Sequence, residues 1–116
     1  MRDTEGNRAN LLNALGLPDA NFYKPHIQSI YSKIYLDDFD QGMLTALNKT
    51  ESNNLVLDLS LVDHIDIDAW HIVVKVHNHL ENKNGKLVIV DMNAKIKEEF
   101  NIKGFDQIIE TRESNM

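Results

Sequence analysis

Two short apolar runs on either side of an amphipathic stretch constrain the fold of this chain most strongly. The runs at 55–59 and 87–90 have the length of buried strands rather than of helices. Between them, over 69–83, apolar residues recur at the spacing of one helix face. These residues are Ala69, Val73, Val76 and Leu80. A strand, a helix and a second strand in this order predict parallel strands joined by a right-handed crossover.

The sequence before these runs extends the alternation towards the N-terminus. Ile and Tyr are frequent over 27–36, which predicts a strand. The residues expected on its buried face are Ile30, Ile34 and Leu36. A fainter strand signal lies at 22–23, and the stretch 40–49 predicts a short helix. The residues that this helix is expected to bury are Met43, Leu44 and Leu47.

The C-terminal part adds one more helix and one more strand. Asn93 is placed to cap a helix that buries Ile96 and Phe100, and Gly104 ends it. A last short strand is expected over 107–110. We therefore predict an α/β fold, with a mostly parallel or mixed sheet of four to five strands and helices packed against it.

The first 25 residues differ from the rest of the chain. A short helix is expected over 7–15, where Gly16 and Pro18 follow it. Such a helix is too short to be stable in isolation, so it either docks on the domain or belongs to a mobile extension. We predict an N-terminal extension over 1–25 and a single domain over 26–116.

Composition excludes several classes of protein. The 116 residues contain no Cys, which excludes a disulfide scaffold and a thiolate metal site. No apolar run approaches the roughly 20 residues that span a membrane, and the N-terminus lacks the apolar stretch of a signal peptide. Because 12 Lys and Arg face 18 Asp and Glu, nucleic acid is not expected as a partner. We expect a cytoplasmic protein.

Acidic residues gather between 37 and 68, where eight acids accompany a single base, Lys49. If the fold brings these acids together, the resulting surface would attract a cationic partner. Alternatively, the acids form a solvated face and cap several helices.

The junction between the strand at 55–59 and the following helix carries a family resemblance. Residues 57–60 read Leu-Asp-Leu-Ser, and residues 66–69 read Asp-Ile-Asp-Ala. This resembles the STAS domain of anti-sigma factor antagonists and sulfate-transporter tails, in which Leu-Asp-Leu-Ser precedes Asp-Ser-Ser-Gly at the start of a helix. The match continues without a gap to residue 105, and the family's Gly-Glu-Leu-Asp is placed at 34–37. The resemblance covers about residues 27–110.

The resemblance implies a non-enzymatic interaction module of bacterial transcription regulation, with no cofactor and no metal. In the family, a partner kinase that is also the anti-sigma factor phosphorylates the first Ser of Asp-Ser-Ser-Gly, and the unphosphorylated form binds that kinase. A phosphate there adds about −1.5 to −2 charges inside the contact surface. Carried over to this chain, the partner-binding residues are expected to be Asp37, Asp66, Ile67 and Asp68. The expected partner is an anti-sigma factor or a kinase-like regulatory protein.

The chain departs from the family at the phospho-acceptor position, which Ile67 occupies. Isoleucine has no hydroxyl group, so the family's phosphorylation switch cannot operate there. One interpretation is an antagonist that binds its partner constitutively. The other is a diverged module that senses a nucleotide or lipid, or acts as a transport-linked scaffold. Asp68 could mimic part of a phosphate, whereas Asp66 and Asp68 could simply cap the helix and complement its dipole.

Other chemistry-bearing residues favour structural roles. Three acids after the strand at 55–59 could hold Mg²⁺, as in aspartate-nucleophile phosphohydrolases, but those enzymes need a longer chain. The three are Asp63, Asp66 and Asp68. His77 and His79 point to opposite sides of a helix, and His71 lies about 12 Å from His79 along its axis, so they cannot share one ion. Trp70 is either a core residue or, if exposed, a hot spot for a partner.

Overall fold

The structure is a computed structural model that describes residues 5–30 and 32–113, with side chains from residue 8 onward. The helices are α1 (Glu5–Ala14), α2 (Lys33–Leu47), α3 (Ile67–Glu81), α4 (Ala94–Ile102) and the 3₁₀ turn η1 (Phe105–Gln107). The strands are β1 (Asn21–Tyr23), β2 (Ser29–Ile30), β3 (Leu55–Asp58), β4 (His64–Ile65), β5 (Leu87–Val90) and β6 (Glu110–Arg112).

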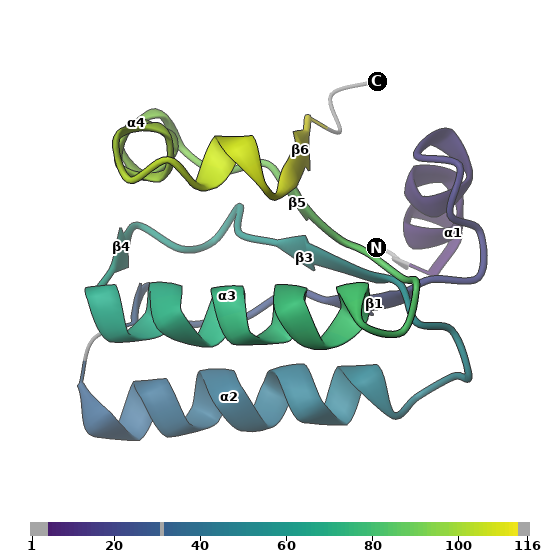
Figure 1. Cartoon of the computed structure of the whole chain (residues 1–116), viewed down its shortest axis with the longest axis horizontal. Coiled ribbons are helices and arrows are strands. Elements are labelled where there is room, and N and C mark those ends of the chain that lie inside the picture. Colours follow the sequence, from purple (N-terminus) through teal and green to yellow (C-terminus); the bar gives the residue numbers. More distant parts are fainter. Residues whose placement is uncertain (1–4, 31, 114–116) are drawn as a thin grey trace.

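Four of the strands form one parallel sheet in the order β1-β3-β5-β6 (Figure 1). The register places Asn21 beside Leu55 and Leu55 beside Leu87. The short strands β2 and β4 pair separately, also in parallel. The predicted α/β fold with a parallel four-stranded sheet is therefore confirmed.

The two central strands are buried on both faces, which explains why their sequences are continuous apolar runs. Because side chains alternate along a strand, Leu55 and Leu57 face the core packed by α2, α3 and α4. Val56 faces the opposite side, together with Val88 and Val90. Helix α1 covers this second face with Leu11 and Leu12, so the helix expected over 7–15 is present and docked.

The boundary predicted at residue 26 stays a prediction. The fainter strand expected at 22–23 is confirmed as β1, and it pairs with β3 inside the main sheet. Sheet pairing and the cluster under α1 thus join residues 11–23 to the rest of the described chain.

The strand predicted over 27–36 is wrong beyond residue 30. Only Ser29–Ile30 is extended, and Ile34, Leu36 and Asp37 lie in α2, which begins seven residues earlier than expected. The Ser32 hydroxyl caps this helix by accepting a hydrogen bond from the Tyr35 amide at 3.4 Å. The residues that α2 then buries recur every three or four positions: Phe39, Met43 and Ala46. The helical period therefore outweighs the β-branched composition, and the family motif placed at 34–37 falls inside a helix.

Two smaller expectations also need correction. Leu44, expected in the core, is 43% exposed because it lies off the stripe that α2 buries. The last strand does not span 107–110 but begins at Glu110. Gly104, with a φ of 81°, ends α4 and leads into η1, whose last residue, Gln107, was expected to begin the strand.

Glu110 forms two ion pairs, one with Lys86 beside β5 and one with Arg112 of its own strand β6. Its carboxylate accepts hydrogen bonds from Lys86 Nζ at 3.1 Å and from Arg112 Nε at 2.8 Å. The hydrogen bond from Lys86 is the largest influence on this group, and it lowers the pKa of Glu110 below its ordinary value even though partial burial opposes it. The ion pairs of Glu110 therefore contribute to stability above the unfolded-state pKa, about 4.3. This contribution is lost as the pH falls through the folded-state pKa.

We expect Glu110→Gln to lower the free energy of unfolding at pH 7 by less than about 1 kcal/mol, since the pairs are largely solvated. The difference from the wild type should shrink at a pH well below the unfolded-state pKa, as the pH falls through the lowered folded-state pKa and the native carboxylate becomes protonated. Urea unfolding at both pH values measures this. Glu98→Gln is a suitable control because Glu98 is exposed and lies outside the ion pairs of the described residues. An equal loss at both pH values would contradict the assignment.

Candidate protein-interaction surface

Pairing of β2 with β4 brings the starts of two helices to one end of the molecule. Ile30 lies beside Ile65, and the Asp66 amide donates a hydrogen bond to the Ile30 carbonyl at 3.0 Å. Helix α2 begins three residues after Ile30, and α3 begins two residues after Ile65. The two helices run in the same direction, side by side along the same side of the sheet (Figure 1). We call the starts of these two helices, with residues 34–37 and 66–68, the helix-start surface.

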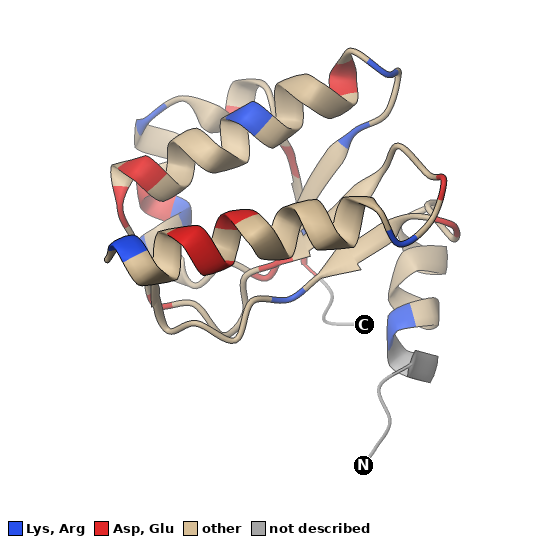
Figure 2. Ribbon diagram, turned by 90° about the horizontal axis from the view of Figure 1, so that it is seen from below, with Lys and Arg blue, Asp and Glu red and all other residues tan. Residues whose placement is uncertain are grey.

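Asp66 occupies the N-cap position of α3 without acting as a side-chain cap. Its backbone is extended, with φ −80° and ψ 163°, but its carboxylate makes no capping hydrogen bond. The predicted capping role is therefore wrong for the Asp66 side chain. Asp68 is exposed in the first turn, where its charge complements the helix dipole. Both carboxylates lie at the helix-start surface, and acidic segments of the two helix starts face the same end in Figure 2.

Ile67 is the first residue of α3 and is 43% exposed. The first turn of α2 adds two further exposed apolar side chains, Ile34 at 71% and Tyr35 at 46%. Neither residue was predicted as part of a site, because a strand was expected there. The signal that could have found them is Ser32, a strong N-cap residue directly before an apolar pattern of helical period. The helix-start surface thus combines apolar side chains with carboxylates.

The acids of α2 are partly neutralised within their own layer. Asp37 is exposed and pairs with Lys33 at 3.2 Å, one turn earlier on the same helix. Asp40 pairs with Lys75 of α3 at 3.5 Å, which links the two helices. The acids between 37 and 68 therefore do not form one uniformly negative face. Asp66, Ile67 and Asp68 do lie at the start of α3, and Asp37 lies one turn into the neighbouring helix α2, at the same end.

Trp70 is a core residue and is unavailable to a partner. It is fully buried, and its ring centroid lies 5.7 Å from that of Phe100 and 5.5 Å from that of Phe105. This packing fixes the rotation of α3 about its axis, because Trp70 must face α4 and η1. The same rotation leaves Ile67 at the solvent-facing edge of the helix.

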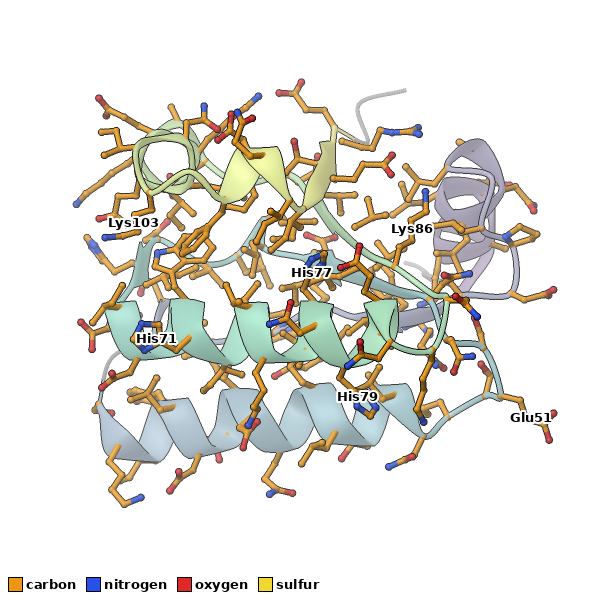
Figure 3. The ribbon with its side chains drawn as sticks, in the orientation of Figure 1. Glu51, His71, His77, His79, Lys86 and Lys103 are labelled. Carbon is orange, nitrogen blue, oxygen red and sulfur yellow. The ribbon has the colours of Figure 1, made fainter. Side chains whose placement is uncertain are left out.

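The histidines of α3 point in different directions, as their spacing predicts. His77 is buried and directed towards the sheet, whereas His79 points towards α2 and His71 is exposed near the start of the helix (Figure 3). Within residues 5–30 and 32–113, no group of three or more His, Asp, Glu or Cys side chains is arranged to hold a metal ion. None of the helices in those ranges is long and apolar enough to cross a membrane.

Comparison of the sequence with models of protein families finds a match over most of the chain. The sequence model of the STAS domain matches residues 33–115, which is most of the chain and includes α2 and all later elements. A search of curated proteins finds no match. STAS domains are in general regulatory or protein-interaction modules without enzymatic activity. The ordered match and the parallel sheet with its flanking helices agree, and the chain belongs to the STAS domain family.

Proposed function

We propose that this STAS domain binds an anti-sigma factor or a related kinase-like regulatory protein through the helix-start surface. The observation that supports the proposal is the exposed Ile67 at the first position of α3, where the family resemblance places a phosphorylatable serine. Asp66 and Asp68 flank this position in the sequence, and with Asp37 near the start of the neighbouring helix they would provide the polar rim of the contact.

Ile67 changes how such a contact is regulated. A serine at a helix start can acquire a phosphate whose charge breaks a contact that already faces carboxylates. Isoleucine cannot be phosphorylated, and its exposed side chain adds apolar area to the same contact. Together with Ile34 and Tyr35 it gives the surface an apolar centre of the kind that carries most of the affinity in protein interfaces. The proposed state is therefore an antagonist that stays able to bind.

The test is capture of partners from the cytoplasm of the source organism with the wild type and two variants of Ile67. Ile67→Asp should reduce the captured kinase-like protein by about tenfold or more, because it replaces a central apolar contact by a charge. The variant should fold normally, since an acid is favourable in the first turn of a helix. Ile67→Ser should retain the partner and gain one phosphate on residue 67, measured by mass spectrometry.

Leu44→Asp is the matched control. Leu44 is also 43% exposed on a helix, but it lies in the second half of α2, away from the helix starts. The Leu44→Asp variant should capture the same amount of the kinase-like protein as the wild type. Equal capture by wild type and Ile67→Asp, or the absence of any kinase-like protein from the wild-type capture, would overturn the proposal.

A further inference from the structure

A groove runs along the free edge of the sheet, at the opposite end of α2 from the helix-start surface. It has a volume of about 840 Å³ and is lined by residues of α1, β1 and α2. We call it the edge groove and define it by Arg8, Leu11, Phe22, Lys24, Ala46 and Lys49. α1 covers one face of the sheet and α2 the other, so the groove wraps around the edge strand between them.

The backbone at the bottom of the groove has hydrogen-bonding groups directed away from the sheet. β1 is the end strand of the sheet, and the Asn21 amide donates to the Asn54 carbonyl at 2.9 Å on the β3 side. Because successive residues of a strand direct their N–H and C=O groups to opposite sides, Tyr23 also faces β3. The N–H and C=O of Phe22 then point outward, and such an edge is a template for another strand.

The charge of the edge groove is opposite to that of the molecule as a whole. The chain has a net charge of −6, yet Arg8, Lys24 and Lys49 all line the groove. Among the described residues, none of these three forms an ion pair with a carboxylate. The guanidinium of Arg8, which is an exposed residue, lies over the Phe22 ring, 4.9 Å from its centroid.

Two acids lie near the three cations, Asp58 among the lining residues and the exposed Asp38 close to Tyr23, so the groove keeps an excess of positive charge. Asp58 is the carboxylate among the lining residues, but it is only 7% exposed and already accepts a hydrogen bond from the Ser60 amide at 2.8 Å. Burial, and then the charge of Asp38, raise the pKa of Tyr23 above its ordinary value. The Tyr23 phenol is therefore protonated at neutral pH and can donate a hydrogen bond to an anion.

We propose that the edge groove binds an extended acidic segment of a partner protein, which adds to the sheet as a strand beside β1. The outward backbone groups at Phe22 pair with the segment's main chain, and the three cations bind its carboxylates. Side chains of the segment alternate between the two faces, so successive ones can point towards Leu11 on the α1 side and towards Ala46 on the α2 side. The free strand edge favours a peptide over a small anion, because it offers directional main-chain pairing that a small anion does not use.

The first experiment uses a probe peptide of eight residues with alternating Glu and Val and blocked termini. Titration of the full, isotope-labelled chain should shift the Phe22 amide resonance and slow its hydrogen exchange. A peptide of the same sequence with N-methyl groups on alternate amides keeps the charge but cannot pair as a strand. It should bind about tenfold more weakly or worse, and an alternating Lys and Val peptide should not bind.

The second experiment changes the groove. The double variant Lys24→Glu with Lys49→Glu should weaken binding of the probe by about tenfold or more, and added salt should reduce the wild-type affinity. Lys103→Glu is the matched control, because Lys103 lies at the other end of the molecule from α1 (Figure 3) and should change the affinity less than about twofold. Thermal unfolding of each variant confirms that the fold is retained, and Arg8→Gln serves as a milder variant if the double variant unfolds.

Two results would overturn the inference. Equal binding of the N-methylated and unmodified peptides would show that charge alone attracts the probe. Binding of inorganic phosphate or a nucleotide in the groove without binding of the peptide would identify a small-anion site instead. Ile67→Asp should leave probe binding unchanged, so the outcome is independent of the function proposed for the helix-start surface.

Discussion

Replacing Trp70 by alanine should lower the free energy of unfolding by about 3–5 kcal/mol. The indole ring is fully buried between α3, α4 and η1, where it contacts Phe100 and Phe105. Its removal leaves a cavity and takes away the contacts that orient α3. Because small domains are stable by only about 5–15 kcal/mol, the variant should be largely unfolded under mild heating. Chemical unfolding followed by circular dichroism measures the loss.

Two companion variants make this prediction specific. Trp70→Phe should cost clearly less, since it keeps an aromatic ring and removes an indole N–H that has no hydrogen-bond partner among the described residues. His71→Ala changes the next residue, which is exposed, and should alter stability by less than about 0.5 kcal/mol. A loss for Trp70→Ala no larger than that for His71→Ala would show that Trp70 does not pack as described.

Replacing Leu12 by alanine should cost about 2–4 kcal/mol, because Leu12 is buried in the cluster between α1 and the valines of the sheet. This loss is expected only if α1 is docked, because the same substitution in a mobile extension would not change the free energy of unfolding. Asn13→Ala is the matched control at the next, exposed position of the helix. Urea unfolding of both variants gives the difference.

Deleting residues 1–17 extends the same test. The deletion removes α1 but keeps β1, and it exposes Val56, Val88 and Val90 to water. We expect a loss of stability at least as large as that of Leu12→Ala, together with a greater tendency to aggregate. An unchanged unfolding curve for the truncated chain would mean that α1 contributes nothing to the fold.

The elements that the sequence predicted well are those with one dominant signal. The runs at 55–59 and 87–90 became β3 and β5 because a continuous apolar run of strand length fits only a strand buried on both faces. Helix α3 was clear from its period, and α4 from its cap: the Asn93 side chain accepts a hydrogen bond from the Ile96 amide at 2.8 Å. For α4 the pattern and the local capping chemistry agree, whereas α3 forms without a side-chain cap because its apolar period is strong enough.

The segment at 27–36 was mispredicted because two signals conflict there. Its Ile and Tyr residues favour a strand, whereas Ser32 and the later spacing of Phe39 and Met43 favour a helix that begins at residue 33. Tertiary packing decides between them, since only the helix buries Phe39 and Met43 against the sheet. This error also concealed Ile34 and Tyr35, which are part of the helix-start surface.

The sequence by itself determined that this chain forms a parallel α/β domain, that Asp66, Ile67 and Asp68 stand at a strand–helix junction, and that residue 67 carries no hydroxyl group. These conclusions depend on local patterns and on side-chain chemistry. Only the tertiary structure decided which side chains meet across the chain. Pairing of β2 with β4 places two helix starts at one end, and the position of β1 at the sheet edge creates a cationic groove on an acidic protein. Such arrangements arise from contacts between residues far apart in sequence, and local periodicity does not encode them.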